Sequence, residues 1–218
     1  MIIGRNRCIV SLATKNSRYV DGLARLSNSL RDNASGIDFL GFIHEYSVGA
    51  PLHTEMPYAF KVHAIQKAID AGYTQIMWLD VSSYAVAPIH HLFDVIDEQG
   101  YWFEGAGCWL GDYTNDETLE YYGIEREYAK QIPMIQSGFM GFDMHSKIGI
   151  NLFSELTFAC DMGLFAGSWS NHRHDQSCMS IGIHRQHATF THVPKYVQYA
   201  GIYDKVLNDK VILKCQGI

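Results

Sequence analysis

The chain has 218 residues, of which 47% are hydrophobic and 13% aromatic, and its formal net charge is −6. This length can fill one well-packed core, or two lobes that share a cleft. The negative charge argues against a surface built for DNA or RNA, so we expect no nucleic-acid partner. No apolar run approaches the roughly 20 residues of a membrane span, so we expect none.

The cysteine pattern and the first residues both bear on the compartment. The five cysteines are scattered along the chain and form no C-x-x-C pair. An odd, scattered set is typical of reduced thiols in a cytosol-like compartment. The opening MIIGRNRCIVSLAT holds too short an apolar stretch for a signal peptide. We therefore expect a cytoplasmic protein.

Strand-like and helix-like segments alternate along the chain. Continuous apolar runs predict buried strands, and apolar residues at three- and four-residue spacing predict helices. Asn16 or Ser17 is a plausible N-cap of the first helix, and glycines follow several of the later ones. The predicted strands are 7–13, 38–45, 75–79, 101–107 and 137–143, and the predicted helices are 17–30, 58–72, 90–100, 146–163 and 174–186.

This alternation predicts an α/β fold with an open, mostly parallel, twisted sheet flanked by helices. In such sheets ligands bind at the carboxyl ends of the strands. Asp80 follows directly after the apolar strand 75–79 and is succeeded by Val81, Ser82 and Ser83. A carboxylate at that place is a candidate binding group. The alternative is that Asp80 only caps a turn.

The stretch 61–86, KVHAIQKAIDAGYTQIMWLDVSSYAV, resembles the nucleotide-sugar glycosyltransferases of the GT-A fold. Their shared pattern is a helix with an early Lys, then a Gly, then an apolar strand that ends in Asp-x-Asp. IVSLAT with Tyr19, IQSGFMGFD, HDQS and THVPK resemble further segments of the family in the same order. The resemblance implies a single catalytic domain over 1–218. Its nucleotide-binding half is about 1–105, and its sugar and acceptor half, with a small acceptor-side lobe, is about 106–218.

The resemblance also assigns roles to residues. It implies that Asp175 and Gln176 are catalytic and contact the donor sugar. It implies a nucleotide-sugar donor, UDP-glucose or a related UDP-sugar, and a glycan acceptor. The residues that would bind the donor are Ala13, Thr14, Tyr19, Lys61, Asp80, Ser137, Gly138 and Lys195.

The chain departs from the family at the second Asp of the motif, which is Ser82 here. Oxygen ligands suit Mn²⁺ or Mg²⁺ at a diphosphate. The resemblance implies a metal held by Asp80, His192 and the diphosphate, with Ser82 as a further ligand that binds through water or not at all. If the site works without a metal, Lys61, Lys195 or Arg18 must neutralise the phosphates instead.

Several alternatives stay open at this stage. The histidines of NHRHDQSCMSIGIHRQH, at 172, 174, 184 and 187, raise the question of a zinc site, although their spacing is unspecific. The aromatic and acidic segment 108–133 is either an acceptor lobe, with Asp112 as an acceptor contact, or a solvated helical insertion.

The function has two alternatives besides glycosyl transfer. One is a metal-dependent hydrolase of phosphate or nucleotide-sugar bonds, and the other is a non-catalytic module that binds a glycan or nucleotide-sugar. The chain also resembles the small glycosyltransferase domains of large algal DNA viruses, in which case the compartment would be the host cytoplasm. The HDQ and HVPK segments favour retention of anomeric configuration.

Overall fold

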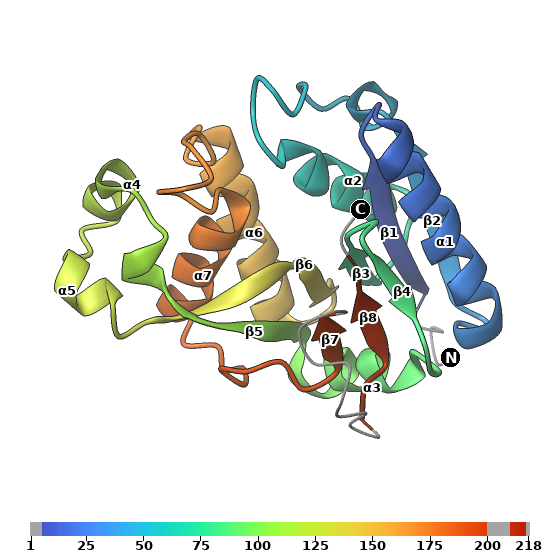
Figure 1. Cartoon of the computed structure of the whole chain (residues 1–218). Helices are drawn as coiled ribbons and strands as arrows, with labels where there is room; N and C mark the ends of the chain where they lie inside the picture. The colour runs from blue at the N-terminus through green and yellow to red at the C-terminus, as the bar shows by residue number, and fades with distance from the viewer. Residues whose placement is uncertain (1–5, 200–209, 217–218) are drawn as a thin grey trace.

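The structure is a computed structural model that describes residues 6–199 and 210–216. A five-stranded sheet runs through its centre, with helices on both faces (Figure 1). In the described part of the chain, no helix combines the length and apolarity that crossing a membrane requires.

The central sheet has the strand order β2-β1-β3-β6-β5. Strand β1 pairs parallel with both β2 and β3, whereas β6 pairs antiparallel with both β3 and β5. Four of its five strands therefore point the same way, and only β6 is reversed. This confirms the predicted mostly parallel sheet. The strands are β1 Arg7–Ala13, β2 Asp38–Ile43, β3 Gln75–Leu79, β5 Tyr101–Trp109 and β6 Pro133–Asp143.

The helices cover both faces because alternate residues of the strands point to opposite sides. Cys8, Val10 and Trp78 pack with α2 and α6, whereas Ile9 and Met77 pack with α1 and α3. Every helix predicted from spacing forms, with ends within a few residues of the prediction. These helices are α1 Ser17–Asn33, α2 Ala59–Asp70, α3 His90–Gln99, α6 Lys147–Asp161 and α7 Asp175–Arg185, and a short 3₁₀ turn, η1, spans Glu45–Val48.

A second sheet of three short strands was not predicted. Its order is β4-β8-β7, and it adds Ala85, Val197 and Leu213 to the core on the α1 and α3 side. Each strand has only three residues, too few for a visible alternation of apolar and polar positions. The strands are β4 Ser83–Ala85, β7 Val197–Tyr199 and β8 Leu213–Cys215.

The segment between β5 and β6 forms a lobe at the end of the molecule opposite α1 and β2 (Figure 1). It contains η2 Leu110–Asp112, α4 Asp116–Tyr121 and α5 Arg126–Ala129. The lobe has its own small apolar cluster, which packs against Ile181 of α7. Segment 108–133 is thus a helical insertion anchored to the body by apolar contacts.

Candidate functional site

Asp80 lies where the sequence predicts, at the carboxyl end of β3. Its backbone N–H donates to the Gly138 carbonyl at 2.9 Å, and its Oδ1 accepts from the Trp78 indole at 2.7 Å. A Cβ on Gly138 would lie 3.0 Å from Asp80 Oδ2, so a side chain at 138 would crowd the carboxylate. The carboxylate is held in one orientation, and its side chain is still 33% exposed.

Lys61 of α2 lies directly behind Asp80, and its side chain is 1% exposed. Its Nζ is 3.2 Å from Asp80 Oδ1 and 2.9 Å from Asp175 Oδ2, and it donates to the Ser137 carbonyl at 2.9 Å. Burial by itself lowers the pKa of Lys61, but the carboxylates of Asp175 and Asp80 outweigh it and hold that pKa above its ordinary value. Lys61 is therefore a buried cation that joins two carboxylates.

Asp175 is the first residue of α7, but its side chain is buried. It lines neither of the two cavities that meet at Asp80, which are described below. The residue at the N-cap position is His174, with φ 50°. Asp175 instead pairs with Lys61 in the first turn of the helix, where a negative charge is favourable. Burial raises the pKa of Asp175 above its ordinary value, and the charge of Lys61 offsets only part of that rise. The next residue, Gln176, does line the larger cavity.

Two cavities meet at Asp80. The smaller, about 150 Å³, is lined by Thr14 and Tyr19 from the end of β1 and the start of α1, and by His53. The larger, about 500 Å³, extends toward the lobe. Asp80, Ser82 and Tyr58 line both. This junction follows from the topology, because β1 and β3 are parallel neighbours whose carboxyl ends lie at one edge.

The larger cavity is lined by a positively charged side chain, Arg173, that the sequence analysis did not single out. The Arg173 guanidinium lies 4.1 Å from the centroid of the Trp169 ring and 4.7 Å from that of Tyr113. Two aromatic faces fix the plane of the guanidinium and leave its edge for a ligand. Only the Trp-x-x-x-Arg spacing ahead of α7 could have suggested it, and that spacing has no distinctive pattern.

Tyr58 is a second residue that the sequence did not reveal. It precedes α2 in the left-handed region, with φ 60°, which is unusual for an aromatic residue. Its ring centroid lies 4.9 Å from Lys61 Nζ, and burial raises the pKa of its hydroxyl to about 12. An uncharged phenol thus stands between the two cavities.

Tyr199 closes another side of the larger cavity. Its hydroxyl donates to the Gln136 side chain, whose amide donates in turn to the Gly105 carbonyl at 2.9 Å. Ser137 and Gly138, both predicted to bind the donor, also line this cavity.

Other predicted residues lie elsewhere. Ala13 is completely buried, and Asp112 and Arg18 are exposed outside the residues that line either cavity. His192 stacks on Trp109 with ring centroids 4.6 Å apart. Lys195 lines a separate cavity with Glu104, whose carboxylate accepts from the Lys195 backbone N–H at 2.6 Å. Neither His192 nor Lys195 lines the cavities at Asp80.

The residues around Asp80 supply some, but not all, of the ligands that a divalent cation needs. Among residues 6–199 and 210–216, no three or more His, Cys, Asp or Glu side chains group as metal ligands, which also leaves the histidines of 172–187 without a zinc cluster. Ser82 Oγ is 3.2 Å from Cys215 Sγ. Mg²⁺ is commonly held by one or two carboxylates together with substrate phosphates. Asp80 can supply that one carboxylate, with Ser82 beside it.

Comparison with known proteins gives the fold an independent check. No protein-family model and no curated protein sequence matches the chain. A solved structure of the bifunctional glycosyltransferase WbbM, in its apo form, matches with a TM-score of 0.58 and 13% sequence identity. The alignment covers 99% of this chain and 46% of that one, so the chain spans less than half of WbbM's length. At this identity the likeness establishes a shared fold, consistent with the GT-A or Rossmann-like type.

Proposed function

We propose that the protein is a glycosyltransferase that moves a sugar from a nucleoside-diphosphate donor to a hydroxyl group of a glycan. The proposed donor is a UDP-sugar, UDP-glucose or a close relative, and the proposed cofactor is Mn²⁺ or Mg²⁺. The observation that carries the proposal is the junction of two cavities at Asp80, a carboxylate fixed at the end of a central strand. The fold shared with WbbM, itself a glycosyltransferase, supports it.

The two cavities suit a nucleotide-sugar whose nucleoside lies in the smaller cavity and whose sugar lies in the larger one. The narrow cavity at Thr14 and Tyr19 offers an aromatic ring and a hydroxyl to a base and ribose. The wider cavity, with Gln136, Ser137 and Gln176, offers amide and hydroxyl groups to a sugar. The diphosphate then falls at Asp80, between the two.

Charge on the leaving diphosphate must be stabilised as the glycosidic bond to it breaks. A divalent cation at Asp80, when bound, would supply positive charge for this purpose. The chain's own cation at the same cavity is Arg173, held between Tyr113 and Trp169. Lys61 is committed to Asp175, Asp80 and Ser137, so its task is to orient Asp80 and to lower the cost of two neighbouring carboxylates.

The donor sugar and the acceptor need to be positioned against each other. The acceptor hydroxyl loses its proton as the new glycosidic bond forms, and an oxygen of the leaving diphosphate accepts that proton. Gln176 lines the larger cavity, where its amide can form hydrogen bonds to sugar hydroxyls. Asp175 does not contact the sugar, and it pairs with Lys61, which in turn orients Asp80. The acceptor would enter from the lobe side, past Tyr113 and Trp169, where ring faces can take the C–H surface of a sugar.

Calorimetric titration of the purified chain with UDP, UDP-glucose and ADP-glucose, with and without Mn²⁺, tests the proposal. We expect UDP to bind more tightly with Mn²⁺, and Asp80→Asn to lose that gain. Asp94→Asn is the matched control, because Asp94 is a surface carboxylate, 64% exposed, that pairs with Arg7. Unchanged metal dependence in Asp80→Asn would contradict the assignment. Donor binding without UDP release in the presence of any acceptor glycan would favour a binding module.

A further inference from the structure

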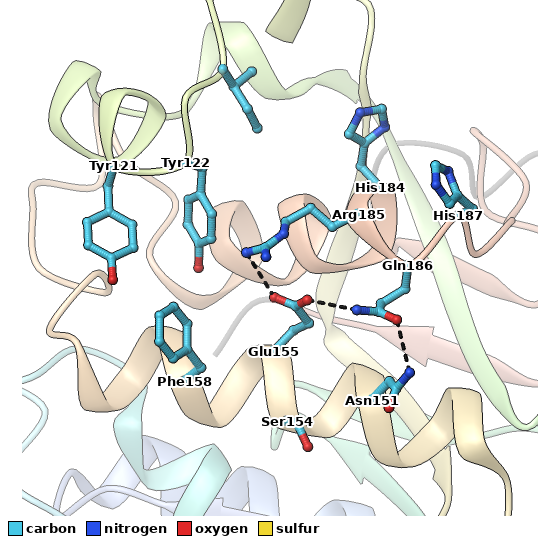
Figure 2. Close-up of a pocket in the computed structure, with 11 residues that line it drawn as sticks. Tyr121, Tyr122, Asn151, Ser154, Glu155, Phe158, His184, Arg185, Gln186 and His187 are labelled. Atoms are coloured by element: carbon cyan, nitrogen blue, oxygen red, sulfur yellow. Dashed lines mark hydrogen bonds and ion pairs between the residues drawn. The ribbon is translucent and has the colours of Figure 1, made fainter.

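A separate cavity of about 850 Å³ lies at the other end of α7 from Gln176. The stretch from Gln176 to Arg185 spans about 14 Å at 1.5 Å per residue, so the two cavities are well separated. Three elements wall it: the end of α4, the middle of α6 and the end of α7 (Figure 2). None of its residues lines the cavities at Asp80.

One wall of this cavity is aromatic and exposed. Tyr121 is 46% exposed and Phe158 is 42% exposed, and their ring centroids are 6.2 Å apart. Tyr122 stands beside them, with the Arg185 guanidinium 5.3 Å from its ring centroid. Rings left open in a concave surface are typical of sites that take an apolar face of a ligand.

Next to these rings lies a row of planar polar groups. Figure 2 shows Glu155 between Arg185 and Gln186, with Asn151 next in the row. Arg185 Nη1 is 3.4 Å from Glu155 Oε2, Gln186 Nε2 donates to Glu155 Oε1 at 2.8 Å, and Asn151 Nδ2 donates to Gln186 Oε1 at 3.1 Å. These contacts fix the orientation of each group and leave spare N–H and lone-pair capacity on the amides and the guanidinium. Each of these groups can therefore form further hydrogen bonds, as donor or acceptor, with a ligand in the cavity.

The charge of the cavity is balanced. Its lining includes one Arg and one Glu, Arg185 and Glu155, and they pair with each other. Burial, with His187 as a smaller contribution, lowers the pKa of His184, which favours the uncharged form of that imidazole. A diphosphate or another acidic ligand would find no excess of positive charge to bind to here. A neutral ligand does not need such an excess, so this lining suits it better.

We propose that this cavity is a second carbohydrate-binding site, which takes a neutral oligosaccharide. The C–H faces of its sugar rings stack on Tyr121 and Phe158, and its hydroxyls bond to Asn151, Gln186 and Arg185. The site binds glycan whether or not the chain transfers sugar. Where it does, the lobe that carries Tyr113 into the first cavity and Tyr121 into the second gives one glycan two places to be held.

The test is calorimetric titration of the full chain with three neutral tetrasaccharides, maltotetraose, mannotetraose and β-galactotetraose, and with an acidic tetragalacturonate. We expect at least one neutral tetrasaccharide to bind at millimolar concentration or below, more tightly than tetragalacturonate. Phe158→Ala and Gln186→Leu should each weaken that binding at least tenfold. Two variants are used so that a folding defect in one leaves the other informative.

Ile150→Ala is the matched control, because Ile150 lies on the same helix as Phe158, is equally exposed at 42%, and does not line the cavity. We expect it to bind like the unaltered chain. Asp80→Asn should leave oligosaccharide binding intact, which separates this site from the proposed transferase site. No binding of any neutral tetrasaccharide, tighter binding of tetragalacturonate, or equal losses in Ile150→Ala would overturn the proposal.

Discussion

The two ends of α7 carry the same kind of ion pair in opposite surroundings. At its start, Asp175 pairs with Lys61 at 2.9 Å, and both side chains are almost completely buried. At its end, Arg185 faces Glu155 at 3.4 Å, and the Arg185 side chain is 47% exposed whereas that of Glu155 is 11% exposed. Burial makes the first pair costly to form and very costly to break, because each charge has given up water. In the second pair Arg185 keeps much of its water, so we expect this pair to contribute less to stability than the first.

This contrast separates two uses of charge in one molecule. The buried pair holds Asp80 in place from behind and is not free to bind a ligand. The exposed pair can exchange its partners for a ligand at small cost.

Removing the buried cation should have the largest effect. Lys61→Met keeps a long apolar side chain but leaves Asp175 buried without its partner, so we expect the free energy of unfolding to fall by about 3–5 kcal/mol. Urea unfolding measures it. Lys67→Met, on the exposed face of the same helix, is the control and should change little. A loss below 1 kcal/mol for Lys61→Met would mean that the buried pair is not formed.

The buried end of α7 should also make stability depend on pH. His172 is completely buried and shares a 2.8 Å hydrogen bond with the Leu164 carbonyl through Nε2. Burial lowers the pKa of His172 from 6.5 to about 4. Between these values the unfolded chain binds the proton and the folded chain does not, so stability falls as pH drops from 6.5 toward 4.

His172→Gln should remove that part of the pH dependence, about 2–3 kcal/mol over this interval. The change is measured as the difference between urea unfolding curves of the two chains at pH 7 and at pH 4.5. Parallel loss in both chains would show that other groups, and not His172, cause the acid sensitivity.

The Ser82 position tests whether the fixed carboxylate at Asp80 works with a cation. Ser82→Asp adds a second carboxylate at the junction of the two cavities, and we expect it to tighten Mn²⁺ binding in the presence of UDP by roughly tenfold. Fluorescence or calorimetric titration with Mn²⁺ measures this. Unchanged or weaker binding would indicate that this side chain points away from the metal.

The smallest effect is expected at the exposed pair. Arg185→Ala should cost about 1 kcal/mol or less in urea unfolding, because its side chain is half exposed and ion pairs with exposed groups typically contribute that amount. Glu155→Gln is the companion variant, because it removes the same pair from the other side while keeping the Gln186 contact possible. A cost that approaches that of Lys61→Met would erase the contrast between the two ends of α7.

The body of the fold could be predicted from the sequence because its signals are local. The apolar run QIMWL predicts the buried strand β3 and places Asp80 directly after it, and the spacing of Leu23, Leu26 and Leu30 predicts α1. Strands β7 and β8 could not be predicted, because three residues carry no periodicity. They are ordered by packing against residues far away in the sequence.

The candidate site was predicted less completely, for physical reasons that differ from residue to residue. Asp80 and Gln176 line the larger cavity at Asp80 because the end of β3 and the start of α7 place them there, and Ser137 lines it from the middle of β6. Lys195 and His192 were assigned from the order of short segments alone, which says nothing about where a loop turns. Arg173 depends on a Trp and a Tyr from different parts of the chain, a contact that only the folded molecule creates.

A structure of the chain with UDP and Mn²⁺ bound would locate the nucleotide. We expect the uracil beside Tyr19 and Thr14, the diphosphate at Asp80, and the terminal phosphate oxygen directed into the cavity lined by Arg173 and Gln176. Nucleotide in any other cavity, or a diphosphate that leaves Asp80 without contact, would contradict this expectation.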